Sequence, residues 1–273
     1  MRNFFILLFF TLISTNTAFG QLPVNKNGRF LEINKAQIYF EEYGEGEPLF
    51  LLHGFLNTAD NWSNFIEEYS KNYRVIVWDM RGHGRSTNPD DQKDFKHQQA
   101  AMDLLELMDK LTIDKTKAIG HSSGAITILY AASIAPEKFE AIIPIAGQHH
   151  YSEPVRDWIK SKIWEDFFDQ EELDSLHGRK KSELLKRQFY NFWKLNGDPS
   201  LSNELLQRIT ARTLVVHGDN DFIPVTQAWE IYNNIPYARI WISPNTGHMP
   251  QYGPGNDTDF IRRSLDFLKG EGW

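Results

Sequence analysis

The sequence predicts an α/β fold: a mostly parallel, doubly wound sheet that an antiparallel hairpin opens and that carries an inserted helical cap. Short apolar runs suit strands buried on both faces. Helical patterns alternate with them, as in a parallel sheet covered by helices. Residues 147–212 form a connection far longer than the dozen or so residues that a crossover between parallel strands requires. This excess length predicts the insertion.

Each strand of the sheet is predicted by one run of residues. Residues 29–33 and 37–43 flank Asn34-Lys35, a pattern that predicts a hairpin of two antiparallel strands. Buried parallel strands are then expected at six runs: 49–52, 74–78, 117–120, 141–146, 213–217 and 239–242.

Three helices are indicated around these strands. Residues 95–111 carry one apolar stripe at helical spacing, and residues 259–268 repeat such a stripe at the end of the chain. Residues 125–135 are apolar all round, as expected of a helix packed deep against the sheet.

The first twenty residues stand apart from the rest. The apolar run from Phe4 to Ile13 is too short to span a bilayer as a helix and suits the core of a signal peptide. Ala18-Phe19-Gly20 suits cleavage before Gln21. We therefore expect residues 1–20 to direct export, and the mature chain to be secreted or periplasmic. The competing interpretation is an uncleaved membrane anchor.

The mature chain is expected to form one core with one insertion. The core is predicted at residues 21–146 and 211–273, and the cap at residues 147–210. The sequence contains no cysteine, so disulfides do not stabilise an exported chain, and the apolar core must do so.

The cap is predicted from two stretches with helical spacing. The first begins at Ser152, a good N-cap, and runs to Phe168, and the second ends at Gly197. Most of the aromatic residues there are expected to pack against the sheet. Some are expected to line a substrate pocket, because ligands bind beyond the carboxyl ends of parallel strands. The candidates are Trp158, Trp164, Phe168, Phe189 and Trp193.

The charge pattern restricts the partners. The net charge is -7 and no basic stripe occurs, which argues against nucleic acid as a partner. We expect a small-molecule substrate, no stable membrane insertion of the mature chain and no cofactor. His149 and His150 form an adjacent pair that cannot complete a metal site alone, so no metal is expected. The sequence leaves the oligomeric state open.

A candidate nucleophile lies in the stretch Gly120-His121-Ser122-Ser123-Gly124, between a predicted buried strand and a predicted buried helix. A sharp strand-to-helix turn holds its central residue in a strained conformation, and side chains two positions away on either side would collide. Ser122 has glycine at both of these positions, whereas Ser123 has His121 and Ala125. The spacing therefore selects Ser122.

A serine of this kind needs a base and an acid that orients the base. In enzymes with such a turn, the acid and then the histidine follow the serine in the chain. His248 lies in the loop after the last predicted strand, and Asp219 and Asp221 lie in the loop after the strand before it. Asp79 precedes Ser122, and we expect it to pair with Arg81 or Arg85 instead. The spacing alone leaves Asp219 and Asp221 open.

Five segments together resemble the α/β-hydrolase fold family, near its serine esterase and haloperoxidase-like branch: "LLHGF", "VWDMRGHGRS", "IGHSSG", "LVVHGDNDFIPV" and "NTGHMP". The resemblance implies that Asp221, at the end of a Gly-x-x-Asp loop, is the acid, and that Asp219 shapes the loop. It also implies an oxyanion hole formed by the backbone N–H groups of Phe55 and Ser123. His53 is expected to hold its own loop together.

The resemblance implies a serine hydrolase with a Ser122-Asp221-His248 triad, acting on a small to medium, largely apolar carboxylic ester through an acyl-enzyme. Hydrolysis of lactones, thioesters or carbon–carbon bonds uses the same triad and stays open. A binding or sensor protein on the same fold is the alternative from another class, and the complete triad argues against it.

We expect the mature protein from its native host to begin at Gln21, because the short apolar run and Ala18-Phe19-Gly20 suit signal-peptide cleavage. Intact-mass measurement or N-terminal sequencing checks this expectation. A chain that retains Met1 would contradict it.

Overall fold

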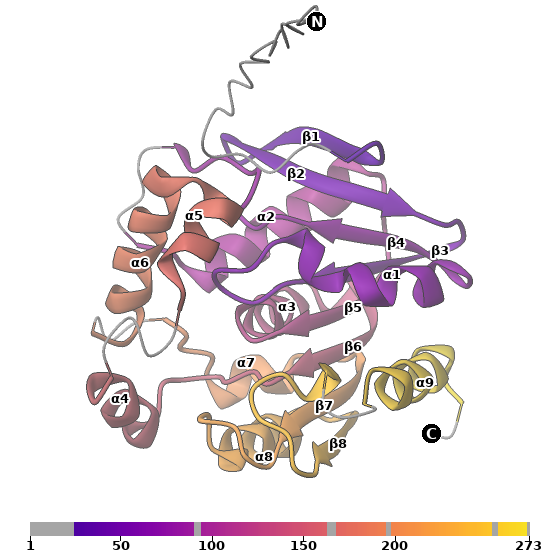
Figure 1. Ribbon diagram of the computed structural model, residues 1–273. Helices are drawn as coiled ribbons and strands as arrows, with labels where there is room; N and C mark the ends of the chain where they lie inside the picture. Colours follow the sequence, from indigo (N-terminus) through magenta and orange to yellow (C-terminus); the bar gives the residue numbers. More distant parts are fainter. Residues whose placement is uncertain (1–24, 90–93, 163–167, 195–197, 253–255, 272–273) are drawn as a thin grey trace, which may run out of the picture.

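The computed structural model describes residues 25–89, 94–162, 168–194, 198–252 and 256–271, and its centre is an eight-stranded sheet (Figure 1). The strand order is β1-β2-β4-β3-β5-β6-β7-β8. β2 pairs antiparallel with both β1 and β4, and the remaining neighbours are parallel. The predicted mostly parallel sheet with an antiparallel hairpin at its start is confirmed.

All eight predicted strands are present, within one or two residues of the expected ends. They are β1 Gly28–Ile33, β2 Ala36–Tyr43, β3 Glu47–Leu52, β4 Tyr73–Trp78, β5 Thr116–His121, β6 Phe139–Ile145, β7 Arg212–Gly218 and β8 Ala238–Ser243. The α-helices are α1 Ser63–Ser70, α2 His97–Lys110, α3 Ser123–Ile134, α4 Glu153–Lys160, α5 Gln170–His177, α6 Arg179–Lys194, α7 Asn203–Gln207, α8 Val225–Asn234 and α9 Asn256–Lys269.

Helices cover the two faces of the sheet and divide the core into two layers. α2, α3 and α8 bury apolar side chains on one face, whereas α1 and α9 do so on the other. α3 is buried along its length except at its last residue, as its uniformly apolar sequence predicts. This arrangement leaves the ends of the strands as the place where loops from different strands meet.

The long connection between β6 and β7 holds α4, α5, α6 and α7 in its described part. In Figure 1, α4, α5 and α6 gather on one side of the molecule, away from α9. α7 packs instead against α3 and α8, and its Leu206 belongs to the core beneath them. The segment thus both projects from the sheet and returns to pack on it.

The local expectations for this segment were met only in part. Ser152 occupies the N-cap position of α4 but its hydroxyl makes no capping hydrogen bond. Pro154 stands at the second helical position, where it offers no N–H to the cap. α5 was not predicted, although Asp169 caps it through the N–H groups of Glu171 and Glu172. The expected helix end at Gly197 lies outside the described residues.

The expected export signal also lies outside the described residues, so the structure adds nothing to that expectation. Within the described part of the chain, none of the helices has the length and apolar character needed to cross a membrane.

The turn from β5 into α3 is tightly packed. A Cβ at Gly120 would lie 2.5 Å from the carbonyl oxygen of Gly124, and a Cβ at Gly124 would lie 2.4 Å from the carbonyl oxygen of Leu52. Backbone atoms at these distances leave no room for a side chain. The two glycines let the helix begin directly against the neighbouring strands.

We expect Gly120→Ala to lower the free energy of unfolding by about 1–3 kcal/mol, because overpacking against backbone forces the turn to shift. Chemical denaturation of the two proteins measures the difference. Gly247→Ala is the matched control, because its Cβ would meet its nearest neighbour only at 3.9 Å. Equal stability losses in the two variants would show that the turn from β5 into α3 can accommodate a side chain at Gly120.

Candidate active site

Ser122 stands at the point of the turn between β5 and α3. Its backbone has φ 52° and ψ -115°, a conformation that costs a non-glycine residue free energy and that the surrounding structure must hold. The Ser122 N–H donates to the carbonyl oxygen of Ile145 at 2.8 Å, so β6 fixes the turn from one side. The hydroxyl is thereby presented at the carboxyl ends of the strands.

The structure brings Ser122, His248 and Asp221 together. His248 Nε2 lies 3.0 Å from the Ser122 hydroxyl oxygen. His248 Nδ1 lies 3.0 Å from each carboxylate oxygen of Asp221. With the ring proton on Nδ1 donated to Asp221, Nε2 is free to accept the serine proton. This is the geometry of a nucleophile, its base and the group that orients the base.

The carboxyl group of Asp221 is kept ionised by its surroundings. Burial by itself raises its pKa, but the hydrogen bond and charge of His248 and the N–H of Ile223 outweigh burial, so the pKa lies below its usual value. In triads of this geometry, an ionised carboxylate both orients the histidine and stabilises the imidazolium that forms when the serine loses its proton.

The other two candidate acids have different partners. Asp219 accepts a hydrogen bond from the N–H of Thr246 at 3.2 Å and so ties two loops together. Asp79 is fully buried and bonds to Arg85 and to the N–H of Ala59, as expected for a structural role. Arg81, the other expected partner of Asp79, pairs with Asp103 instead.

Two histidines hold the surrounding loops. His53 Nε2 accepts from the N–H of Met80 at 2.9 Å, and His53 Nδ1 lies 2.7 Å from the carbonyl oxygen of Gly54. His121 Nε2 donates to the carbonyl oxygen of His248 at 2.8 Å. Burial lowers the pKa of His121 to about 3, so the ring stays neutral beside the triad. His121 therefore fixes the backbone of the base, a role that the sequence did not reveal.

The two residues expected to form the oxyanion hole lie beside Ser122. Ser123 is the first residue of α3, where a backbone N–H has no acceptor within the helix and lies at the positive end of the helix dipole. Phe55 follows β3 and lines the same cavity as Ser122. Their role as oxyanion donors stays a prediction.

A cavity of about 390 Å³ opens beside the triad, within the size range of small-molecule sites. Apolar side chains from α3 and from loops of the core form much of its wall, among them Ile126, Ile223 and Met249. Asn57 and Gln148 add two amide side chains, and neither was foreseen. No lysine or arginine lines the cavity among the described residues.

Three of the five cap aromatics named from the sequence line this cavity: Trp158, Phe168 and Phe189. The Trp158 ring stacks on Phe222 at 4.5 Å between centroids, and Phe222 in turn lies 4.6 Å from the ring of His248. Trp164 lies outside the described residues, and the side chain of Trp193 is not described. The cap residue Trp158 is thus linked through the ring of Phe222 to His248, the histidine of the triad.

The adjacent histidines His149 and His150 meet Glu230 of α8, and one ligand-type atom of each lies within 4.8 Å of the others. His149 Nε2 is 2.7 Å from a Glu230 carboxylate oxygen, and His150 Nδ1 is 3.0 Å from His149 Nε2. These are hydrogen-bond distances; atoms bound at 2.0–2.1 Å to a tetrahedral metal stand roughly 3.3 Å apart. The structure supplies Glu230 as a third potential ligand. Hydrogen bonds already join His149 to Glu230 and His150 to His149.

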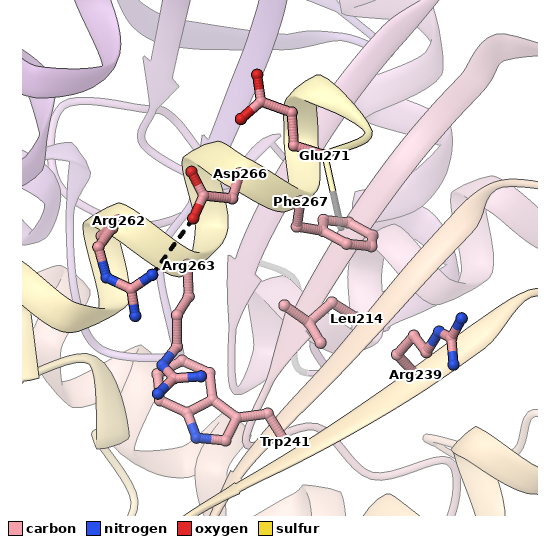
Figure 2. A pocket seen from close by; sticks show the side chains of 8 residues that line it. All are labelled: Leu214, Arg239, Trp241, Arg262, Arg263, Asp266, Phe267 and Glu271. Carbon is pink, nitrogen blue, oxygen red and sulfur yellow. Dashed lines mark hydrogen bonds and ion pairs between the residues drawn. The ribbon is translucent and has the colours of Figure 1, made fainter. Parts of the chain in front are cut away.

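A second hollow, of about 370 Å³, lies between β7, β8 and α9 and shares no residue with the cavity at Ser122 (Figure 2). Its arginines are engaged: Arg262 pairs with Asp259 and Asp266, and the Arg263 guanidinium lies over the ring of Trp241. Neither a serine nor a histidine is among its described lining residues. Its described lining therefore offers neither the nucleophile nor the base of a serine hydrolase.

Comparisons with known proteins show similarity to hydrolases of the α/β fold. A family model described as alpha/beta hydrolase fold matches residues 47–174. The 2-hydroxy-6-oxo-6-phenylhexa-2,4-dienoate hydrolase of Burkholderia cepacia is 27% identical over 291 aligned residues, which cover 94% of this chain and 99% of that protein. The serine hydrolase BPHL of Homo sapiens is 28% identical, with 79% of this chain and 78% of that protein covered.

Solved structures show the same fold. The enol-lactonase from Burkholderia xenovorans LB400 superimposes with a TM-score of 0.71 at 19% identity, covering 88% of this chain and 100% of that one.

We expect Asp221→Asn to lower kcat by orders of magnitude, on the order of 10⁴-fold as in comparable triads, because the imidazole loses its orienting partner. Steady-state kinetics on an ester substrate measures this. Asp219→Asn, which keeps a side-chain oxygen for the N–H of Thr246, is the control and should cause a far smaller loss. The reverse ranking would make Asp219 the acid.

Proposed function

This chain belongs to the α/β-hydrolase fold family, and we propose that it is a serine hydrolase that cleaves a small to medium, neutral and largely apolar carboxylic ester. The observation that carries the proposal is the continuous contact from Asp221 through His248 to Ser122 at the mouth of an apolar cavity. A binding protein does not require a strained serine whose hydroxyl is hydrogen-bonded to a histidine.

The proposed reaction follows from the positions of these groups. The Ser122 oxygen attacks the ester carbonyl while His248 Nε2 takes the serine proton, and the N–H groups of Phe55 and Ser123 receive the charge on the carbonyl oxygen. His248 then gives the proton to the leaving alcohol, and the acyl group stays on Ser122. Water, deprotonated by His248, releases the acid and restores the serine.

The wall of the cavity favours an uncharged substrate. A substrate carboxylate buried in this cavity would lack a lysine or arginine as counter-ion, because neither is found among the described residues that line it. The dienoate in the name of the Burkholderia cepacia relative carries a carboxylate. We therefore place a neutral ester first. Hydrolysis of a dienoate at a carbon–carbon bond, favoured by that relative, is the second candidate.

Export to the periplasm or the medium is part of the proposal and rests on the sequence of residues 1–20. A substrate that reaches the enzyme outside the cytoplasm would have to be soluble or released locally. A neutral ester of modest size fits both the cavity and this location.

A panel of p-nitrophenyl esters of increasing acyl length, together with a 2-hydroxy-6-oxodienoate, tests the proposed function. We expect turnover of the esters, labelling of the protein by a fluorophosphonate, and loss of both in Ser122→Ala. Turnover of the dienoate alone would support the second candidate. Binding of these compounds without turnover by the unchanged protein would contradict a hydrolase.

The contact of Trp158 with the cavity predicts a role in acyl-chain preference. We expect Trp158→Ala to shift the ratio of kcat/KM between long and short acyl chains by about 10-fold or more, because each methylene group in an apolar pocket is worth roughly 1–3 kcal/mol. The thermal midpoint should change little. Leu268→Ala, buried on the opposite face of the sheet, is the control: it should lose about 2–5 kcal/mol of stability with the ratio unchanged.

A further inference from the structure

A second Asp–His–Ser array lies directly beside the nucleophile. His97, at the start of α2, has its Nδ1 2.6 Å from a carboxylate oxygen of Asp198, which also accepts the backbone N–H of His97 at 2.8 Å. His97 Nε2 lies 2.9 Å from the hydroxyl oxygen of Ser123. His97 is fully buried. Three distant parts of the chain thus meet at the residue that follows Ser122.

The proton positions in this array determine what Ser123 offers. In the neutral tautomer that donates Nδ1–H to the Asp198 carboxylate, Nε2 of His97 has a lone pair. The Ser123 hydroxyl therefore donates its proton to His97. A hydroxyl has one hydrogen and two lone pairs, so Ser123, which lines the cavity, keeps acceptor capacity for a bound molecule.

Two further acceptors line the same cavity. His121 donates through Nε2 to the backbone of His248, so its Nδ1 is a bare lone pair. His121 Nδ1 and the side-chain oxygen of Gln148 are buried and have no hydrogen-bond partner among the described residues. Buried polar groups are normally satisfied. A cavity with three such acceptors favours a ligand that brings hydrogen-bond donors.

The position of the donor on the ligand follows from covalent geometry. The backbone nitrogen and the hydroxyl oxygen of one serine are about 3–4 Å apart. If the carbonyl oxygen of the substrate lies on the Ser123 N–H, a donor on the carbon next to that carbonyl is separated from the carbonyl oxygen by a similar span. Two parallel hydrogen bonds to Ser123 therefore suit a donor at this position best.

We propose that Ser123, held by His97 and Asp198, selects esters and lactones that carry an O–H or N–H group on the carbon next to the scissile carbonyl. The inference rests on the proposed ester hydrolysis and names the class of substrate. Ser123 is then a specificity residue that touches the substrate. His97 and Asp198 are positioning residues that keep its hydroxyl turned toward His97.

A purely structural role of this array predicts a different experimental result. Asp198 lies between α6 and α7, so its bonds to His97 also tie the long connection to α2. A brace of this kind affects stability and slows every substrate alike. It does not change the preference between two substrates that differ only in one hydrogen-bond donor.

The test compares methyl mandelate, which has the α-hydroxyl group, with methyl α-methoxyphenylacetate, in which the same oxygen has no hydrogen. We expect the unchanged protein to prefer mandelate, and Ser123→Ala to lower the ratio of their kcat/KM values about tenfold. Proton release at constant pH measures both rates. N-hexanoyl homoserine lactone against its N-methylated form repeats the comparison for an N–H donor.

Variants separate the array from a general disturbance. His97→Phe should lower the same ratio, and the double variant with Ser123→Ala should lower it no further, because both act through one hydroxyl. Ser133→Ala removes another buried serine of α3, bonded only to the carbonyl of Tyr130 in the described structure, and should leave the ratio unchanged. Equal slowing of both esters in Ser123→Ala would overturn the proposal.

A binding measurement keeps the two proposals distinguishable. In Ser122→Ala, calorimetry should give a dissociation constant for methyl mandelate about tenfold lower than for the methoxy compound, and Ser123→Ala in that background should abolish the difference. Failure of every ester to turn over, with this difference present, would refute ester hydrolysis and support the acceptor role. Turnover without any preference for the donor would do the opposite.

Discussion

The conformation of Ser122 is the constraint on which the rest of the site depends. A backbone at φ 52° is held only because the chain is enclosed on both sides. Ile145 of β6 binds the Ser122 N–H, and Leu52 of β3 packs against Gly124. These are the two strands that flank β5 in the sheet. The strand order therefore decides that this serine is presented to the cavity.

The sequence was sufficient to predict the sheet and the approach of His248 and the aspartates to Ser122, because both follow from local patterns joined by a rule of topology. Short apolar runs mark strands buried on two faces, and the carboxyl ends of parallel strands share one edge. His248 and the aspartates follow such runs, so their approach to Ser122 could be foreseen. The choice of Asp221 needed the family resemblance, and the structure places its carboxylate against His248.

The array behind Ser123 could not be foreseen, and the reason is distance along the chain. His97 and Asp198 are 101 positions apart, and no spacing rule relates a helix start to a residue before α7. Likewise, His121 reads as one residue of a turn, and only the fold brings it to the carbonyl of His248. Contacts that join loops to loops leave no periodic trace in a sequence.

The two ends of the long connection between β6 and β7 are fastened to each other. His150 and Ser200 form an antiparallel bridge, and the N–H of Leu201 donates to the carbonyl oxygen of His149 at 2.9 Å. These two backbone contacts join the beginning and the end of the connection directly, independently of the helices between them. A protease that cuts the chain between α4 and α6 would therefore leave a nicked enzyme in one piece, with β7 still paired to β6.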